Sequence, residues 1–124
     1  MIVAGFGCRT VTTSAALHAA LEGARRALPG GMTVGALAAP ADRRAQLVPL
    51  AHALALPLLS VGAAEVRGQT TKTISSRCLA VRGCGSVAEA VALAAAGAGG
   101  RLLVTRHISP DRTATCAIAQ GENP

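Results

Sequence analysis

GCGSVAEAVAL, residues 83–93, carries the strongest local signal in the chain. Ser86 followed three residues later by Glu89 is a capping box, in which a serine caps a helix N-terminus and the glutamate reaches back to the capping residue. The apolar residues that follow extend the helix until the glycines at 97–100 end it. Apolar runs on both sides of this helix alternate with helical patterns, which favours an α/β domain.

Short buried strands are expected at residues 2–6, 33–38, 57–60, 101–105 and 114–119. We expect Gly5 and Gly7 to break the first strand, and a polar loop over residues 106–112 to join the last two. These five segments predict a three-layer α/β/α single domain over residues 1–124, with a mostly parallel or mixed sheet of about five strands.

Helices are expected between the first three strands. The first has the apolar stripe Leu17, Leu21, Ala24 and Leu28, and Thr12, Thr13 or Ser14 as its N-cap. The second has the stripe Leu47, Leu50, Ala51 and Leu54, and Pro49 predicts that it either starts near that residue or is kinked there. Ser60 is expected to cap a short helical turn up to Val66.

Three further features concern order and location. The polar residues 67–76 predict a mobile loop, and residues 120–124 predict a disordered tail. The first residues enter a strand without a charged leader, and Arg or Pro interrupts every apolar run before it reaches the length of a membrane span. We therefore expect a cytoplasmic protein with no membrane partner.

The composition excludes some classes of site and favours others. Of 124 residues, 28 are Ala and Phe6 is the only aromatic, which excludes sites built on aromatic stacking. Eleven Arg and one Lys face six acidic residues, and arginine forks bind carboxylate or phosphate bidentately. The arginines are scattered, so nucleic acid is not expected as a partner; GC-rich coding alone is an alternative explanation of the charge.

The four cysteines indicate no metal site. Cys8, Cys78, Cys84 and Cys116 lack zinc-ligand spacing, and no metal or cofactor is expected. Cys116 lies in an apolar strand pattern and is predicted to be a small buried hydrophobe. Cys8, beside Arg9 at a predicted helix entrance, is a candidate nucleophile, although no histidine is near it in sequence.

Two glycine-bearing segments, at residues 5–9 and 83–86, are expected to lead into helix N-termini. Free N–H groups at such turns bind anions, so Gly5, Gly7 and Gly83 are candidate ligand-binding residues. The alternative is that these glycines only permit tight turns. Glu89 is likewise either a capping residue or a functional one.

Together these residues resemble the CobE and CbiG C-terminal domain family of cobalamin (vitamin B12) biosynthesis proteins. The resemblance covers most of the chain. It rests on VAGFGCR at residues 3–9, on GCGSVAEAVAL at 83–93, and on the two closing segments, 101–104 and 113–119. Ser75 falls where the family has a serine shortly before the central motif.

Two departures from the family pattern concern charge. Residues 42–46, DRRAQ, replace a lysine followed by acidic residues, and Arg106 stands where the family often has lysine. Both changes keep a cation for anion binding but would remove a lysine acting as a base or nucleophile. The N-terminal region of CbiG has no counterpart in this chain.

The resemblance implies a role in corrin-ring synthesis, with a precorrin or hydrogenobyrinic acid as a polycarboxylate ligand that the protein binds or passes on. The expected ligand-binding residues are Gly5, Gly7, Cys8, Arg9, Ser75, Gly83, Ser86, Glu89 and Arg106. Other corrin-pathway enzymes and a second copy of the chain are possible protein partners.

Three alternatives stay open at the level of the sequence. The first is a hydrolase that opens a precorrin lactone with release of acetaldehyde, as CbiG does, with Glu89 as candidate general base. The second is a phosphate- or nucleotide-binding module that uses the same turns. The third is a structural partner in a biosynthetic complex, without a ligand of its own.

Overall fold

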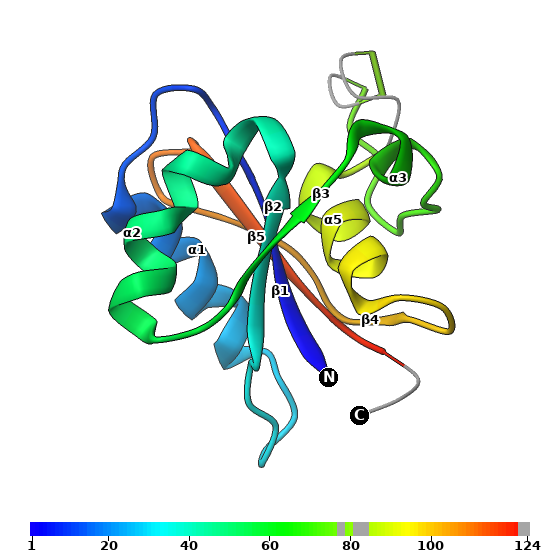
Figure 1. Cartoon of the computed structure of the whole chain (residues 1–124), viewed down its shortest axis with the longest axis horizontal. Coiled ribbons are helices and arrows are strands. Elements are labelled where there is room, and N and C mark those ends of the chain that lie inside the picture. The colour runs from blue at the N-terminus through cyan, green and yellow to red at the C-terminus, as the bar shows by residue number, and fades with distance from the viewer. Residues whose placement is uncertain (77–78, 81–84, 122–124) are drawn as a thin grey trace.

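A computed structural model describes residues 1–76, 79–80 and 85–121. Its centre is a five-stranded sheet in the order β3-β2-β1-β5-β4 (Figure 1). Strands β1, β2 and β3 are parallel, whereas β5 is antiparallel to both β1 and β4, so the sheet is mixed. The strands are β1 (Ile2–Cys8), β2 (Ala36–Pro40), β3 (Leu58–Val61), β4 (Arg101–Ile108) and β5 (Ala114–Gln120).

Helices cover both faces of this sheet, and the predicted three-layer α/β/α fold is confirmed (Figure 1). One face carries α1 (Ser14–Arg26) and α2 (Arg44–Leu54), the latter preceded by the 3₁₀ turn η1 (Ala41–Arg43). The other face carries α3 (Ala63–Arg67) and α5 (Val87–Ala96). No helix within the described ranges is long and apolar enough to cross a membrane.

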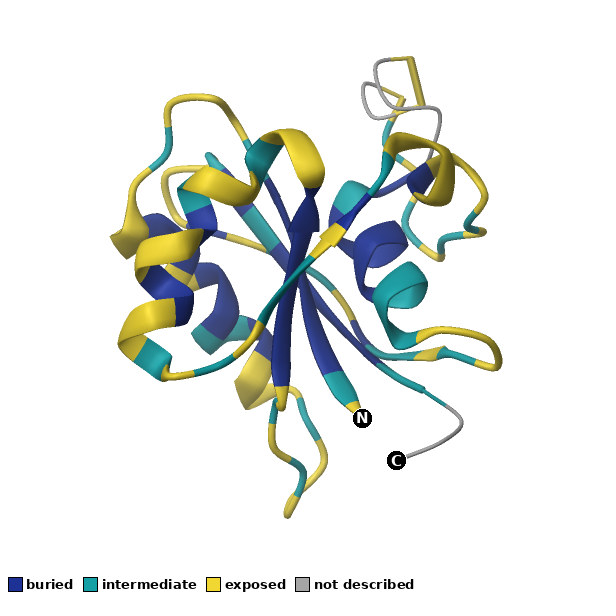
Figure 2. Cartoon of the chain, in the orientation of Figure 1, coloured by how far each residue is buried: buried dark blue, intermediate teal, exposed yellow. Residues whose placement is uncertain are grey.

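The core lies in two apolar layers, one on each side of the sheet (Figure 2). On the first side, the predicted stripe of α1 is buried at Leu17, Leu21 and Ala24. On the second side, α5 is built almost entirely of small residues, so its backbone approaches β1 closely. A Cβ added at Gly5 would lie 2.5 Å from the carbonyl oxygen of Ala88, so only glycine fits here.

Several predicted boundaries are wrong, and the largest error concerns the two glycines. Gly5 and Gly7 do not break β1, because the strand continues to Cys8 in antiparallel register with β5. Arg106 lies in β4 and not in a loop, since that strand runs to Ile108. The predicted strand over 33–38 is observed as β2, which begins three residues later than expected.

The smaller corrections involve element ends. Gly62, and not Ser60, occupies the N-cap of α3, and the helix continues to Arg67, the first residue of the predicted loop. Gln120, the first residue of the predicted tail, is the last residue of β5, and Gly121 donates its N–H to Met1. Pro49 lies inside α2, which starts five residues before it.

Candidate functional site

The carboxyl ends of β1, β2, β3 and β4 all point to one edge of the sheet. The chain leaves β1 toward α1 on one face, whereas α5 begins on the other face, where Gly7 approaches Val87. Ligands of open α/β sheets bind where successive connections diverge in this way, beyond the carboxyl ends of the strands.

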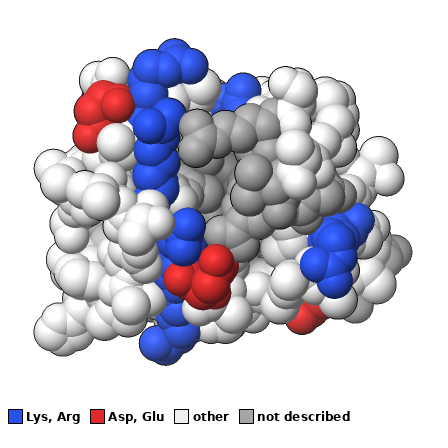
Figure 3. Space-filling view, turned by 90° about the horizontal axis from the view of Figure 1, so that it is seen from above, with Lys and Arg blue, Asp and Glu red and all other residues white. Residues whose placement is uncertain are grey.

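Cations gather at this edge, from segments far apart in the sequence. Arg9 follows β1, Arg43 and Arg44 follow β2, and Arg112 lies in the β4–β5 turn, where the Arg9 N–H bonds to the Thr113 carbonyl at 2.9 Å. Figure 3 shows Lys and Arg side chains running across this end of the molecule. We call Arg9, Arg43, Arg44, Lys72, Arg106 and Arg112 the cationic edge.

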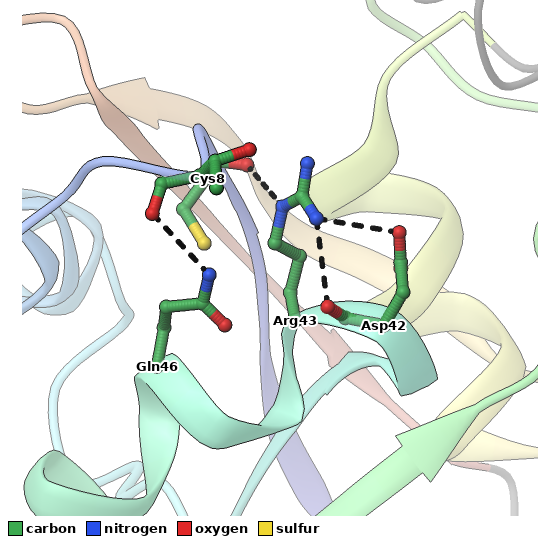
Figure 4. Close-up of polar contacts among 5 residues, drawn as sticks. Cys8, Asp42, Arg43 and Gln46 are labelled. Atoms are coloured by element: carbon green, nitrogen blue, oxygen red, sulfur yellow. Dashed lines mark hydrogen bonds and ion pairs between the residues drawn. The ribbon is translucent and has the colours of Figure 1, made fainter.

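Arg43 joins the ends of β1 and β2 (Figure 4). Its Nε donates to the carbonyl oxygen of Cys8 at 3.1 Å, and its Nη1 lies 3.4 Å from a carboxylate oxygen of Asp42. The side-chain amide of Gln46 donates to the Thr10 carbonyl on the same loop at 3.4 Å. These bonds hold the segment after β1 against the start of α2, and therefore fix the backbone that carries Arg9.

Asp111 organises the turn between β4 and β5. Its Oδ1 accepts from the Ser109 hydroxyl at 2.7 Å and from the backbone N–H and hydroxyl of Thr113 at 3.0 and 2.9 Å. These bonds, first of all that from Ser109, lower the pKa of Asp111. The carboxylate is thus engaged by the turn that presents Arg112.

Glu89 is the most deeply buried carboxylate in the described part of the chain, with 0% exposure. One oxygen accepts the backbone N–H groups of Lys72 and Thr73, each at 2.9 Å. The other accepts the Thr73 hydroxyl and the Arg106 N–H, the latter at 2.9 Å. The Glu89 carboxylate therefore links α5 to β4 and to residues 72–73, which precede α5 in the sequence.

The capping box is only half formed. Ser86 caps α5 as predicted, because its hydroxyl accepts the Glu89 N–H at 3.4 Å. The Glu89 carboxylate does not return the bond to the capping residue, since among the described residues it accepts from Lys72, Thr73 and Arg106. The prediction that Glu89 simply caps its own helix is therefore wrong.

Burial and hydrogen bonding act on Glu89 in opposite directions. Desolvation is the largest single effect and raises its pKa, but the bonds from Thr73, Arg106 and Lys72 together outweigh it, so the pKa lies below 4.5. Glu89 is thus an ionised, fully engaged carboxylate, not one poised to take a proton near neutral pH.

The segment before α5 packs tightly over the start of that helix. A Cβ added at Gly85 would lie 2.6 Å from the Thr73 carbonyl oxygen and 2.7 Å from Ile74, and the Ser75 N–H bonds to the Gly85 carbonyl at 2.7 Å. Residues 71–75 therefore form a cover over the N-terminus of α5, which we call the α5 cover.

The predicted site residues divide into three groups. Cys8, Arg9, Ser75, Ser86, Glu89 and Arg106 lie at the carboxyl edge or around the start of α5. Gly5 and Gly7 lie within β1 against α5 and Thr115, which gives them a packing role. Gly83, with Cys78 and Cys84, lies outside the described residues.

The sequence did not single out Lys72 and Thr73 as parts of this region, because the polar run around Thr73 was predicted only as a loop. Residues 42–46 were expected to keep a cation for anion binding, but the contact of Arg43 with the end of β1 was not predicted. The bonds to Cys8 and Glu89 span 35 and 16 or more residues, so no local pattern could reveal them. Cys116 is buried as predicted, and burial raises its pKa.

No group of three His, Cys, Asp or Glu able to hold a metal occurs within the described ranges. An open groove of about 420 Å³ lies between the C-terminal ends of α3 and α5, lined mainly by glycine and alanine with Glu65. It contains none of the predicted site residues and no cation.

Fold and edge together define a mixed-sheet α/β/α domain with a cationic carboxyl edge. Residues 2–119 match the family model described as cobalamin synthesis G C-terminus. The chain belongs to this family of cobalamin biosynthesis proteins, as its resemblance to CobE and CbiG predicted.

Solved structures similar to the chain include three proteins of cobalamin biosynthesis. CobE, a protein from the cobalamin (vitamin B12) biosynthetic pathway, is 31% identical, with a TM-score of 0.81 over 96% of this chain and 89% of that one. The cobalamin biosynthesis protein chiG of Agrobacterium tumefaciens str. C58 is 36% identical, with a TM-score of 0.75 over 99% and 100%. A cobalamin biosynthesis protein G homologue of Sulfolobus solfataricus shares the fold at 19% identity and a TM-score of 0.72, over 98% of this chain and 37% of that one. No curated protein matches the chain.

Proposed function

We propose that this protein binds a corrin-ring intermediate, a precorrin or hydrogenobyrinic acid, at the cationic edge and holds it or passes it on. The observation that carries the proposal is the gathering of six basic residues from separate segments at the carboxyl edge of the sheet (Figure 3). Corrin precursors carry several acetate and propionate carboxylates around the ring, so a ligand of this class meets many cations at once.

The six basic residues of the cationic edge outnumber the acidic residues near them, so the edge keeps a net positive charge. Asp111 is held by the β4–β5 turn, Asp42 pairs with Arg43, and Glu89 is buried under the α5 cover. Arg9 and Arg44 remain exposed at the strand ends, where a carboxylate can reach their guanidinium groups. Membership in a cobalamin biosynthesis family supports a corrin intermediate as the source of those carboxylates.

Glu89 does not fit the role of general base that the hydrolase alternative requires. A general base works best with a pKa near the operating pH and with a lone pair directed at the substrate. Glu89 accepts four hydrogen bonds, is fully buried, and has a lowered pKa, so it fits neither requirement. The geometry supports binding over lactone hydrolysis through this residue.

One of the two glycine turns that the phosphate-module alternative requires is not formed. This alternative needs free N–H groups at residues 5–9, but Gly5 and Gly7 lie inside β1 and pair with β5. A phosphate or nucleotide would therefore meet the same side-chain cations as a carboxylate, without a glycine-rich cradle. Competition by inorganic phosphate or ATP remains a direct test of this class.

The test is a titration with hydrogenobyrinic acid followed by corrin absorbance, for the wild type, Arg9→Gln and the matched control Arg26→Gln. Arg26 lies in the last turn of α1, at the opposite end of the molecule, so its loss changes net charge equally without touching the edge. We expect saturable binding that weakens about 3- to 10-fold in Arg9→Gln and stays unchanged in Arg26→Gln.

Other results would change the conclusion. Absence of saturable binding, or equal weakening by both variants, would overturn the proposal. Conversion of the corrin to a new absorbing species would indicate an enzyme. Displacement by millimolar phosphate or ATP would favour a phosphate site.

A further inference from the structure

We propose that Glu89 is a positioning residue for the ligand site, because it fixes the backbone of two cations of the cationic edge, Lys72 and Arg106. The inference rests on the proposed function and adds how the site is assembled. Glu89 touches no ligand in this scheme; it acts through the two basic residues.

Both basic residues donate their own backbone N–H to the same carboxylate. Lys72 N bonds to one oxygen of Glu89 at 2.9 Å, and Arg106 N bonds to the other at 2.9 Å. The two backbones are thus only two hydrogen bonds and one carboxyl group apart, although they are 34 residues apart in sequence. The buried carboxylate of Glu89 therefore fixes the backbone positions from which the Lys72 and Arg106 side chains extend.

The arrangement around Arg106 depends on an irregularity in β4. Val104 pairs with Ile118 and His107 with Cys116, so Thr105 and Arg106 together oppose the single residue Ala117. Such a β-bulge removes an N–H from the regular ladder and redirects it. Here the Arg106 N–H is directed at Glu89 instead, which leaves it satisfied only while the carboxylate is present.

The same carboxylate holds the α5 cover through Thr73. Two donors of this residue, the N–H and the hydroxyl, reach the two oxygens, and the neighbouring Lys72 supplies a third donor from the cover. An ionised side chain without exposure is costly to bury unless its oxygens are fully bonded. The four donors satisfy this requirement, which indicates that the buried Glu89 carboxylate has a specific structural role.

Glu89→Gln is expected to affect the bond to Arg106 differently from the bonds to the α5 cover. The amide oxygen can still accept from the N–H groups of Lys72 and Thr73, and the Thr73 hydroxyl can turn to accept from the new NH₂ group. The Arg106 N–H then faces a donor and loses its partner. The reverse orientation of the amide would leave two N–H groups facing a donor, so the first orientation is preferred.

Thr73→Val is the matched variant for the other arm. It removes the hydroxyl donor from the cover but leaves the Arg106 bond intact. A residue that only stabilises the fold would produce the same ligand affinity in both variants once folding is verified by circular dichroism. A positioning role through Arg106 predicts different affinities.

The experiment is a double-mutant cycle on hydrogenobyrinic acid affinity with Glu89→Gln, Arg106→Gln and the double variant. We expect each single variant to weaken binding about 5-fold or more, and Glu89→Gln to cost less than 2-fold when Arg106 is already replaced. Thr73→Val is expected to weaken binding less than Glu89→Gln does. Additive losses from Glu89→Gln and Arg106→Gln would overturn the inference.

A second measurement needs no ligand, so failure of the inference can be told from failure of the proposed function. Amide hydrogen exchange in the free protein is expected to speed up at least 10-fold at Arg106 in Glu89→Gln, and to stay unchanged there in Thr73→Val. Unchanged exchange at Arg106 in folded Glu89→Gln would refute the positioning role. If the wild type binds no corrin while exchange responds as expected, the proposed function fails and the structural role of Glu89 stands.

Discussion

At the scale of single residues, the fold depends on Gly5, which has no side chain, and on Glu89, whose carboxylate is fully hydrogen-bonded. Gly5 lets the α5 backbone rest on β1, and Glu89 joins α5 to two segments on either side of it in the sequence. Both residues belong to motifs that were visible in the sequence, but their roles differ from the predicted ones. The glycine is needed for its missing side chain rather than for a turn.

Gly5→Ala is expected to lower the free energy of unfolding by about 3 kcal/mol, at the upper end of overpacking effects. The new Cβ would lie 2.5 Å from the Ala88 oxygen, and backbone on both sides must move to relieve the contact. Urea denaturation measures the change. Gly30→Ala is the control, since its Cβ would meet nothing within 4 Å, and we expect a change below about 0.5 kcal/mol; similar losses in both variants would contradict the packing role.

At the scale of elements, helix positions were predictable but their ends were not. The Ser86 cap of α5 follows from a local motif and is confirmed, and the predicted stripe of α1 is confirmed at Leu17, Leu21 and Ala24, whereas Leu28 lies beyond the end of the helix. Three candidates for the α1 N-cap were equivalent in sequence, and the structure assigns Thr13, whose hydroxyl accepts the Ala16 N–H at 3.0 Å. Ends shifted where pairing with a neighbouring strand decided them, as it did for β1 and β4.

Pro49→Ala is expected to stabilise the protein by about 1–2 kcal/mol. The proline lies at an exposed position inside α2, where its ring clashes with the preceding turn and no N–H is available for the helix. The alanine chain loses more entropy on folding, which offsets part of the gain. Thermal and urea unfolding would measure the change in stability. The exposed substitution Val48→Ala is the control, and we expect it to change stability by less than about 0.5 kcal/mol. An unchanged or lower stability of Pro49→Ala would show that α2 accommodates the ring without strain.

At the scale of the whole molecule, the alternation of elements and the excess of arginine predicted an α/β/α domain with an anionic ligand. The sequence did not show that β5 inserts between β1 and β4, because strand order is set by long-range packing. It also did not show which of the scattered arginines share an edge. The partners of Glu89 escaped prediction for the same reason: they lie 16 or 17 residues away on both sides.

Glu89 makes the stability of the whole molecule depend on pH in the acid range. Its pKa lies below 4.5 in the folded state, so its contribution is complete above that value and is lost as the pH falls through the folded pKa. We expect Glu89→Gln to be less stable than the wild type by about 1–3 kcal/mol at pH 7, with the difference shrinking below pH 4.5.

Unfolding curves between pH 7 and pH 2 measure this difference. Glu22→Gln serves as the control, because Glu22 is a partly exposed carboxylate of α1 that pairs with Arg25, and its effect should stay below about 1 kcal/mol throughout. A gap between wild type and Glu89→Gln that stays constant down to pH 2 would contradict the assignment of the pH dependence to this carboxylate.

The strand order also decides how the protein can be attached to something else. Because β5 returns beside β1 in antiparallel register, Gly121 bonds to Met1, and both described ends lie at the edge opposite the cations (Figure 1). A tag, a sensor surface or a fused reporter joined at either terminus therefore leaves the cationic edge facing solution. Immobilised protein can be used for the corrin titrations from either end, and both orientations should give the same affinity.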